Sequence, residues 1–296
     1  MNPTSDPLVS IILPVHNGGL QLAVAVHSIV AQTLRDWELI VIDDGSSDGA
    51  IEDLRRDLGD SRLVISGDSR NVGLSARLNE GVSMARGRYI ARMDHDDIAH
   101  PDRLRLQVDL MTRQTDVDLC GARCVAMDEV GSIIGALPQA LTHEEICAQP
   151  WMGLHLAHPT WLGKAEWFRK NRYREPGPFR CEDQELLLRS YANSRFAAVS
   201  KSLLSYRVRK RQHFSTIFKT RRALAEAQVQ RFWRHGPRNW AALSILVAAS
   251  RIAADGMRVL TGGLAPVKVG AEPGEIAEWS TIIADLQICV GNSAKR

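Results

Sequence analysis

Acidic side chains follow two apolar runs in the first hundred residues of the chain. Asp43 comes directly after the run 39–42, and Asp94 and Asp96 follow the run 89–93. In an extended segment, Asp-x-Asp spacing puts two carboxylates on the same side, about 6.5 to 7 Å apart. Such a pair suits one hard cation, and Mg²⁺ or Mn²⁺ bridging phosphate oxygens would let an acidic edge accept an anion. Taken singly, each acidic motif could equally be a helix N-cap or a solvated turn.

The apolar runs alternate with amphipathic stretches, and this alternation is typical of an α/β domain with a mainly parallel sheet. Ligands of such sheets bind beyond the carboxyl ends of the strands, where the acidic motifs stand. The predicted strands cover residues 8–15, 37–42, 62–66 and 89–93, and the predicted helices cover residues 19–32, 48–58 and 73–86.

The pattern changes after residue 115. We expect a hairpin from 117–127 and 132–137, a helix at 182–192, and two short strands at 196–199 and 203–208. Beyond residue 214 the sequence is helical, with breaks at 236–237 and 262–273. The sequence therefore predicts a catalytic unit at 1–212 and a helical C-terminal annex at 213–296.

The 296 residues are 45% hydrophobic and 24% charged, a composition too apolar for a disordered chain. The net charge of +3 hides an asymmetry, because residues 1–125 carry 13 Lys and Arg against 19 Asp and Glu. Ten Lys and Arg lie between Glu185 and Glu226, where there is no acid. This basic half could face an anionic membrane surface, nucleic acid or solvent, or pack in a homodimer. No nucleic-acid motif accompanies the tract, so specific nucleic-acid binding is not expected.

The five cysteines predict a reducing cytosol rather than a disulfide framework, because their number is odd and no signal-peptide pattern precedes them. Cys120 and Cys124 lack nearby partners for a zinc site. The longest apolar run, 240–249, would span about 15 Å as a helix against about 30 Å of hydrocarbon. The stretch 239–262 is better interpreted as an amphipathic helix that packs in the protein or lies on a membrane surface.

Five segments occur in an order typical of one known family. They read VSIILPVHN, ELIVIDDGSSDG, NVGLSARLNEG, GRYIARMDHDDIAHPDRL and RCEDQELLLR, and they cover about residues 8–208. The sequence resembles family 2 glycosyltransferases, whose nucleotide-diphospho-sugar binding fold is called GT-A. The resemblance implies a GT-A type sheet flanked by helices and a transferase that moves one sugar from a nucleotide-diphospho-sugar to an acceptor.

The resemblance assigns a nucleotide pocket to the first three motifs. Asp43 would hydrogen-bond the nucleobase, and the backbone around Pro14, Val15 and Asn17 would line the pocket. Asn71 would make a polar contact near the nucleotide. A UDP-sugar is the favoured donor.

The same resemblance places a metal and a base. Asp94 would contact the ribose or the sugar, and Asp96 would be the direct ligand of Mg²⁺ or Mn²⁺ on the diphosphate. Inverting transfer needs a group that takes the acceptor's proton, and the family supplies it from a Glu-Asp pair, here Glu182 and Asp183. We expect Asp183 to be the base, with its pKa lowered by the helix N-terminus. Alternatively, Glu182 and Asp183 are acids at a helix N-terminus that only complement the helix dipole.

His158 and Arg207 have weaker assignments, to the acceptor side and the donor diphosphate respectively; His158 could equally be structural. The acceptor would be a saccharide, free or lipid-linked, such as a cell-surface polysaccharide precursor, and the protein would be cytoplasmic or peripheral on the cytoplasmic face of the membrane. Two alternatives stay open. A sugar-phosphate nucleotidyltransferase would carry a basic glycine-rich loop, whereas this chain has no lysine before Lys164. A non-catalytic module binding membrane or nucleic acid would leave the acidic motifs without a role.

Overall fold

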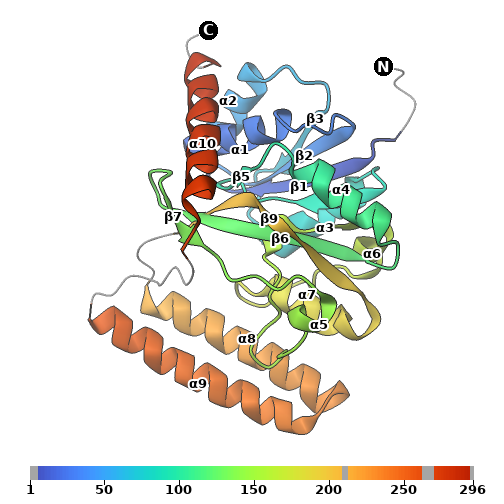
Figure 1. Cartoon of the computed structure of the whole chain (residues 1–296), viewed down its shortest axis with the longest axis vertical. Helices are drawn as coiled ribbons and strands as arrows, with labels where there is room; N and C mark the ends of the chain where they lie inside the picture. Colours follow the sequence, from blue (N-terminus) through green and yellow to red (C-terminus); the bar gives the residue numbers. More distant parts are fainter. Residues whose placement is uncertain (1–5, 209–212, 262–269, 294–296) are drawn as a thin grey trace.

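A single sheet of nine strands organises the protein, which is described from a computed structural model over residues 6–208, 213–261 and 270–293. The strand order is β3-β2-β1-β4-β8-β6-β9-β5, with β7 paired to β6. The pairings set β1 to β4, β6 and β9 in one direction and β5, β7 and β8 in the other, so the predicted mainly parallel sheet is confirmed (Figure 1). The strands are β1 (Val9–Val15), β2 (Trp37–Asp44), β3 (Leu63–Asp68), β4 (Tyr89–Arg92), β5 (Ile98–Ala99), β6 (Leu119–Met127), β7 (Ile133–Ala136), β8 (Leu162–Lys164) and β9 (Phe196–Arg207).

Helices cover both faces of this sheet. Side chains of α1, α2 and α4 pack into one buried cluster, and side chains of α3, α6 and α7 pack into another. The helices are α1 (Gly19–Val30), α2 (Ala50–Asp57), α3 (Leu74–Met84), α4 (Arg103–Arg113), α5 (His143–Ile146), α6 (Ala165–Lys170), α7 (Glu182–Ser190), α8 (Phe214–His235), α9 (Arg238–Leu260) and α10 (Pro273–Ser293).

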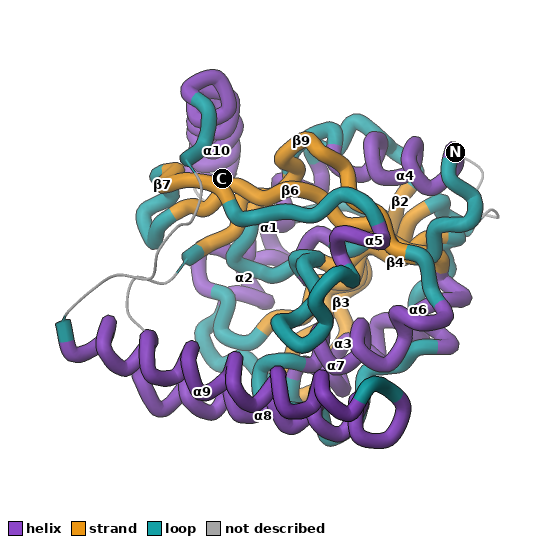
Figure 2. Tube along the Cα trace, turned by 60° about the horizontal axis from the view of Figure 1, so that its bottom comes forward, coloured by secondary structure: helices purple, strands orange, loops and turns teal. Residues whose placement is uncertain are grey.

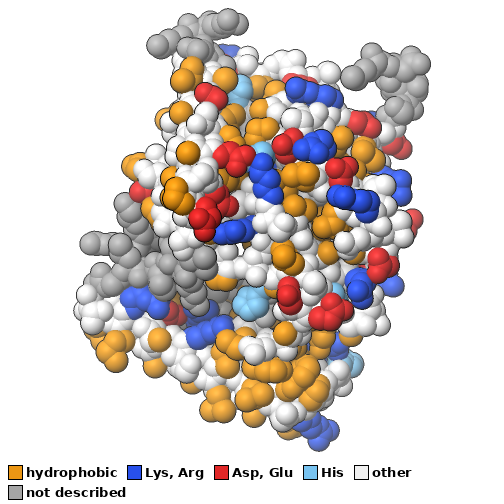
Figure 3. All heavy atoms as spheres, in the orientation of Figure 1, with side chains coloured by type: hydrophobic (Ala, Val, Ile, Leu, Met, Phe, Trp, Pro, Cys, Tyr) orange, Lys and Arg blue, Asp and Glu red, His pale blue; other side chains and the backbone are white. Residues whose placement is uncertain are grey.

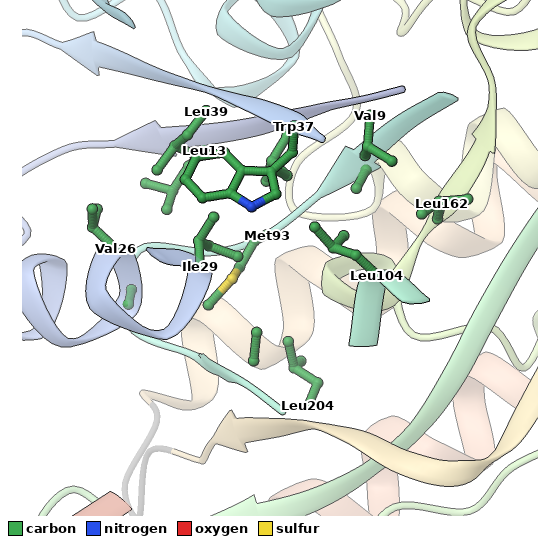
Figure 4. Packing of buried hydrophobic residues seen from close by; sticks show 14 of the residues in the cluster. Val9, Leu13, Val26, Ile29, Trp37, Leu39, Met93, Leu104, Leu162 and Leu204 are labelled. Atoms are coloured by element: carbon green, nitrogen blue, oxygen red, sulfur yellow. The ribbon is translucent and has the colours of Figure 1, made fainter. Parts of the chain in front are cut away.

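The central strands are buried on both faces. In β1, Leu13 belongs to the cluster under α1, whereas its neighbour Ile12 belongs to the cluster under α3, as alternation along a strand requires. Figure 4 shows Leu13, Trp37 and Ile29 packed together in the first cluster. This rigid layer fixes the carboxyl ends of β1, β2 and β4, where the polar motifs begin.

The C-terminal helices dock at two separate places. Helices α8 and α9 lie side by side as a pair, with α10 at the opposite end of the molecule (Figures 1 and 2). Gln228 and Arg231 fasten α8, donating to the carbonyls of Pro150 (2.8 Å) and Leu188 (2.9 Å). Helix α10 packs against α1 and β7. None of the helices among the described residues is long and apolar enough to span a bilayer.

The predicted hairpin is present as β6 and β7, but the two short strands predicted after residue 195 are wrong. One strand, β9, runs through the polar residues 200–202, and register shifts against β6 around Arg123 absorb the irregularity. Cys120 and Cys124 are buried in β6 without a disulfide, and burial raises the pKa of Cys120 to about 12. The domain boundary predicted at 212 and part of the predicted break at 262–273 fall at 209–212 and 262–269, outside the described residues.

Candidate active site

The ends of β1 and β2 bring the predicted nucleotide residues together. In the parallel register Pro14 pairs with Ile42, and Val15 pairs with Asp43. The chain then leaves both strands into adjoining loops, 16–18 and 45–49. Because Pro14 and Val15 lie in a buried strand, they fix where these loops start.

Asn17 holds the two loops against each other. Its side-chain carbonyl accepts a hydrogen bond from the Ser47 N–H at 2.9 Å, and its own N–H donates to Ser46 Oγ at 3.0 Å. Asp43 accepts from the Ser46 N–H at 2.9 Å. Asn17 has a φ of +53°, a conformation that asparagine adopts more readily than most residues. One oxygen of Asp43 therefore braces the loop.

A buried ion pair sets the position of the third loop, residues 69–73. Arg77 of α3 donates to Asp44 Oδ1 at 3.0 Å and to Asp68 at 2.7 Å. The same Asp44 carboxylate accepts from the backbone N–H groups of Val72 (2.7 Å) and Gly73 (3.1 Å). Asp44, directly after the predicted base-binding Asp43, is thus a structural residue that places the loop carrying Asn71.

Three carboxylates cluster after β4. Asp94, Asp96 and Asp97 bring oxygen atoms within 4.8 Å of one another. Asp97 is buried, and its Oδ1 accepts the Arg207 N–H at 2.9 Å. Its Oδ2 has no hydrogen-bond partner among the described residues. Burial, together with the charges of Asp94 and Asp96, raises the pKa of Asp97 well above its usual value.

This cluster fits a hard divalent cation. Like charges this close repel each other unless a cation or a proton offsets them, and the unpartnered oxygen of Asp97 is an available ligand atom. Carboxylate oxygens are what Mg²⁺ and Mn²⁺ prefer. Arg92 is buried, and its guanidinium contacts the two carboxylate oxygens of Asp94 at 2.7 and 2.5 Å. This ion pair orients one carboxylate of the cluster. Asp97 is a candidate ligand that the sequence prediction omitted.

Arg207 supports this cluster from β9. Its guanidinium donates to the backbone carbonyls of Asp96 (2.9 Å), Asp128 (3.0 Å) and Glu129 (3.0 Å). These bonds tie the acidic segment to the turn between β6 and β7. A diphosphate contact by Arg207 remains a prediction.

A cavity of about 1200 Å³ opens beside the acidic cluster. Five residues predicted to belong to the site line it, and they come from four different parts of the chain. They are Asn71, Asp94, His158, Glu182 and Asp183. Arg92, Tyr206 and the loop 175–180 also line the cavity. Two predicted donor-side residues, Asn71 and Asp94, therefore face a common space with the acceptor-side residues, whereas Asp43 and Asp96 are not among the residues that line it.

Glu182 and Asp183 open α7 at this cavity. The expectation of a lowered pKa for Asp183 is wrong, because burial, and then the charge of Glu182, raise it. Burial likewise raises the pKa of Glu182. Desolvation of adjacent carboxylates outweighs the favourable helix N-terminus here. A carboxylate with a raised pKa is a stronger proton acceptor once it is ionised.

His158 is a buried neighbour of this pair. Its Nε2 lies 2.7 Å from the Tyr173 hydroxyl, and its Nδ1 lies 3.6 Å from Glu182 Oε1. Burial and the nearby Arg92 lower the pKa of His158 to about 3, so the imidazole is neutral at physiological pH. The sequence prediction missed both Tyr173 and Arg92 as residues of the site. No motif contains Tyr173, whereas Arg92 could have been noticed as a cation inside an otherwise apolar strand.

The fold and the acidic edge identify the class of protein. The model of "Glycosyl transferase family 2" matches residues 10–183, and the chain belongs to this family. An uncharacterized glycosyltransferase of Methanocaldococcus jannaschii, MJ1057, is 29% identical over 234 residues, 77% of this chain and 80% of the relative. The putative glycosyltransferase EpsE of Bacillus subtilis is 31% identical over 191 residues, 63% of this chain and 68% of the relative.

Solved structures share the fold. Residues 1–349 of Staphylococcus aureus TarS, in complex with UDP-GlcNAc, match with a TM-score of 0.63 at 16% identity, over 94% of this chain and 80% of that one. The mannosyltransferase PcManGT of Pyrobaculum calidifontis, in complex with GDP-Man and Mn²⁺, matches with a TM-score of 0.59 at 16% identity, over 98% and 87%. The sheet described above is therefore a GT-A fold, and the protein is a family 2 glycosyltransferase.

Proposed function

We propose that the protein is an inverting, metal-dependent glycosyltransferase that moves one sugar from a nucleotide-diphospho-sugar to a saccharide acceptor. The observation that carries the proposal is the common cavity, in which Asp94 of the acidic cluster faces Glu182 and Asp183. An in-line displacement needs the leaving diphosphate and the proton acceptor on opposite sides of the reacting sugar. A space of about 1200 Å³ between these groups can hold a sugar and an acceptor hydroxyl.

On the donor side, Asp43 and the loops that Asn17 clamps would hold the nucleobase. Asp94 would contact the ribose or the sugar. Asp96, with Asp97, would hold Mg²⁺ or Mn²⁺, which supplies charge to stabilise the departing diphosphate. A UDP-sugar is the favoured donor, and the Mn²⁺ and nucleotide sugars bound to the structural neighbours are compatible with this donor chemistry.

On the acceptor side, Asp183 would take the proton of the acceptor hydroxyl as that oxygen bonds to the anomeric carbon. The glycosidic bond to the nucleotide diphosphate breaks in the same step, so the anomeric configuration inverts. Neutral His158 would pack beside Glu182 and hydrogen-bond Tyr173 rather than carry charge. The catalytic domain would be residues 1–212, with 213–296 as a helical annex.

The donor is identified by a thermal-shift screen of UDP-, GDP- and dTDP-sugars, each with and without Mn²⁺, because only a bound nucleotide raises the unfolding temperature. We expect a UDP-sugar with Mn²⁺ to give the largest rise. Asp96→Ala should abolish the Mn²⁺-dependent part of that rise and sugar turnover. Asp53→Ala is the matched control, since Asp53 is exposed on α2 and does not line the cavity. Full metal-dependent turnover by Asp96→Ala would refute the role of Asp96.

A further inference from the structure

Helix α9 turns its charged side chains toward the protein. Asp255 is buried and pairs with Arg221 of α8 at 3.1 Å and with Arg258 at 2.9 Å. Arg251 donates to the carbonyl of Met152 at 2.9 Å. Arg251, Asp255 and Arg258 are all the charged residues between 239 and 260. Every charged side chain of α9 after Arg238 therefore makes a contact within the protein.

The outer face of α9 is uncharged after Arg238 and mostly apolar, with Asn239 and Ser250 as exposed polar residues. Leu246, Met257 and Leu260 are 65%, 67% and 86% exposed, and Ile245 is 55% exposed. At 3.6 residues per turn, Leu246, Met257 and Leu260 fall on the side opposite Asp255, with exposed alanines between them. An ordinary surface helix has the reverse arrangement, with its apolar stripe inward. Orange side chains gather over α8 and α9 at the lower end of the molecule (Figure 3).

The α8–α9 pair is also strongly basic. Residues 213–261 carry eight Lys and Arg against two acids, Glu226 and Asp255. Both acids are paired, Glu226 with Arg222 at 2.7 Å. At the end of α8 the 62% exposed ring of Trp233 lies 5.2 Å from the Arg238 guanidinium. An exposed tryptophan beside cations, next to an apolar helix face, is the side-chain set found at the interface of a bilayer.

We propose that the outer face of α9, flanked by the cations of the α8–α9 pair, binds the surface of an anionic lipid bilayer. Charge selects this occupant over a second copy of the chain, because Lys219, Arg234 and Arg238 of the α8–α9 pair are exposed and form no ion pair among the described residues. Two copies facing each other would oppose like charges, whereas anionic headgroups offset them. The inward-facing ion pairs keep α9 on the protein, so its outer side chains alone enter the lipid.

Helix α8, against which α9 packs, lies beside the wall of the catalytic cavity. Phe179, in the cavity wall, lies 6.0 Å from Lys219 Nζ of α8, and a second hollow of about 400 Å³ separates the loop 176–179 from that helix. A membrane under α9 would therefore present anchored molecules near the acceptor side. Resting on the proposed function, this inference makes the acceptor a lipid-linked saccharide.

The test is flotation of the full chain with vesicles of phosphatidylcholine alone and of phosphatidylcholine with phosphatidylglycerol in equal parts. We expect the protein to float with the anionic vesicles and mostly to stay behind with the neutral ones. Leu246→Glu should abolish flotation, because it puts a charge at the centre of the apolar face. Ile288→Glu is the matched control, since Ile288 is 61% exposed on α10, and it should float like the wild type.

Three results would overturn the proposal. They are a wild-type protein that stays behind with anionic vesicles, a Leu246→Glu variant that floats like the wild type, and a lipid-free dimer that Leu246→Glu converts to monomer. The last would make a second copy the occupant. Leu246→Glu should keep the donor-induced thermal shift, so a lost lipid surface is distinguished from a lost donor site. No donor-induced shift in any variant would count against the proposed function and the lipid-linked acceptor.

Discussion

At the scale of single residues, two opposing influences act on the pKa values of Glu182 and Asp183, which begin α7. The helix N-terminus favours ionised carboxylates, yet burial raises the pKa values of Glu182 and Asp183. Their separate roles can be distinguished because the amide of asparagine keeps the shape of Asp183 and removes its basicity.

Asp183→Asn should reduce sugar transfer by about 10² to 10⁴-fold, the usual contribution of a positioned general base. Donor affinity, measured by calorimetry with the nucleotide and Mn²⁺, should change little, because the nucleobase and diphosphate are expected to bind elsewhere. Gln184→Glu is not a suitable control, since Gln184 bonds to Leu154. Glu166→Gln, on α6 outside the cavity, is the control. Wild-type transfer by Asp183→Asn would exclude it as the base.

The raised pKa of Asp183 also sets the direction of the pH dependence. The proposed base must be ionised to take the acceptor's proton, so the rate should fall as pH drops through the pKa of Asp183 in the folded enzyme. Because burial raises that pKa, the acid limb should lie above about 3.9, where an exposed aspartate protonates. A profile of kcat at saturating donor measures this limb. A rate that stays constant to the pKa of an exposed aspartate would contradict the raised value.

At the scale of elements, the loops around the proposed nucleotide pocket depend on Arg77 of α3. The side chain is 4% exposed and pairs with the 9% exposed side chain of Asp44, which in turn accepts the N–H groups of Val72 and Gly73. The Arg77 contacts therefore couple α3 to the end of β2 and to the loop of Asn71.

Arg77→Met should lower the free energy of unfolding by about 3 to 5 kcal/mol, because it leaves the buried Asp44 carboxylate without its cation. Urea denaturation measures the change. Arg105→Met removes a 46% exposed arginine that pairs with Asp102, and it should cost less than about 1 kcal/mol. Equal losses in the two variants would show that Arg77 is no more important than a surface ion pair.

The sequence predicted local elements better than long-range pairings. The alternating runs before residue 93 appear as β1 to β4 and α1 to α3 because their periodicity is local. Strands β5 and β8 have two and three residues, and only pairing with distant strands defines them. In the site, sequence motifs pointed to Asp94, Asp96 and Asp183. The motifs did not point to Asp97 as a ligand, because its unpartnered buried oxygen results from tertiary packing.

At the scale of the whole molecule, α10 braces the segment that follows the acidic cluster. Trp279 is fully buried with Ile98 of β5, and its ring meets that of His100 edge-on, with the centroids 5.7 Å apart. Glu278 lies 2.9 Å from His100 Nε2. A helix remote in sequence thus supports the backbone just after Asp97.

Trp279→Ala should lower the free energy of unfolding by about 3 to 5 kcal/mol, because it opens a cavity in this cluster. Trp233→Ala, which truncates a 62% exposed ring, is the matched control and should change stability little. Chemical denaturation in lipid-free buffer measures both. If Trp279→Ala is as stable as the control, α10 does not brace the segment.

The pairing of β5 with β9 has a consequence for the order in which the protein folds. Ile98 pairs with Ser205, and Leu119 of β6 pairs with Phe196 of the same β9. Contacts between such distant residues close slowly, after local helices have formed. During refolding, helical circular dichroism should therefore recover before the proposed Mn²⁺-dependent donor binding. The folding chain would therefore form its helices before the β5–β9 pairing places the acidic cluster.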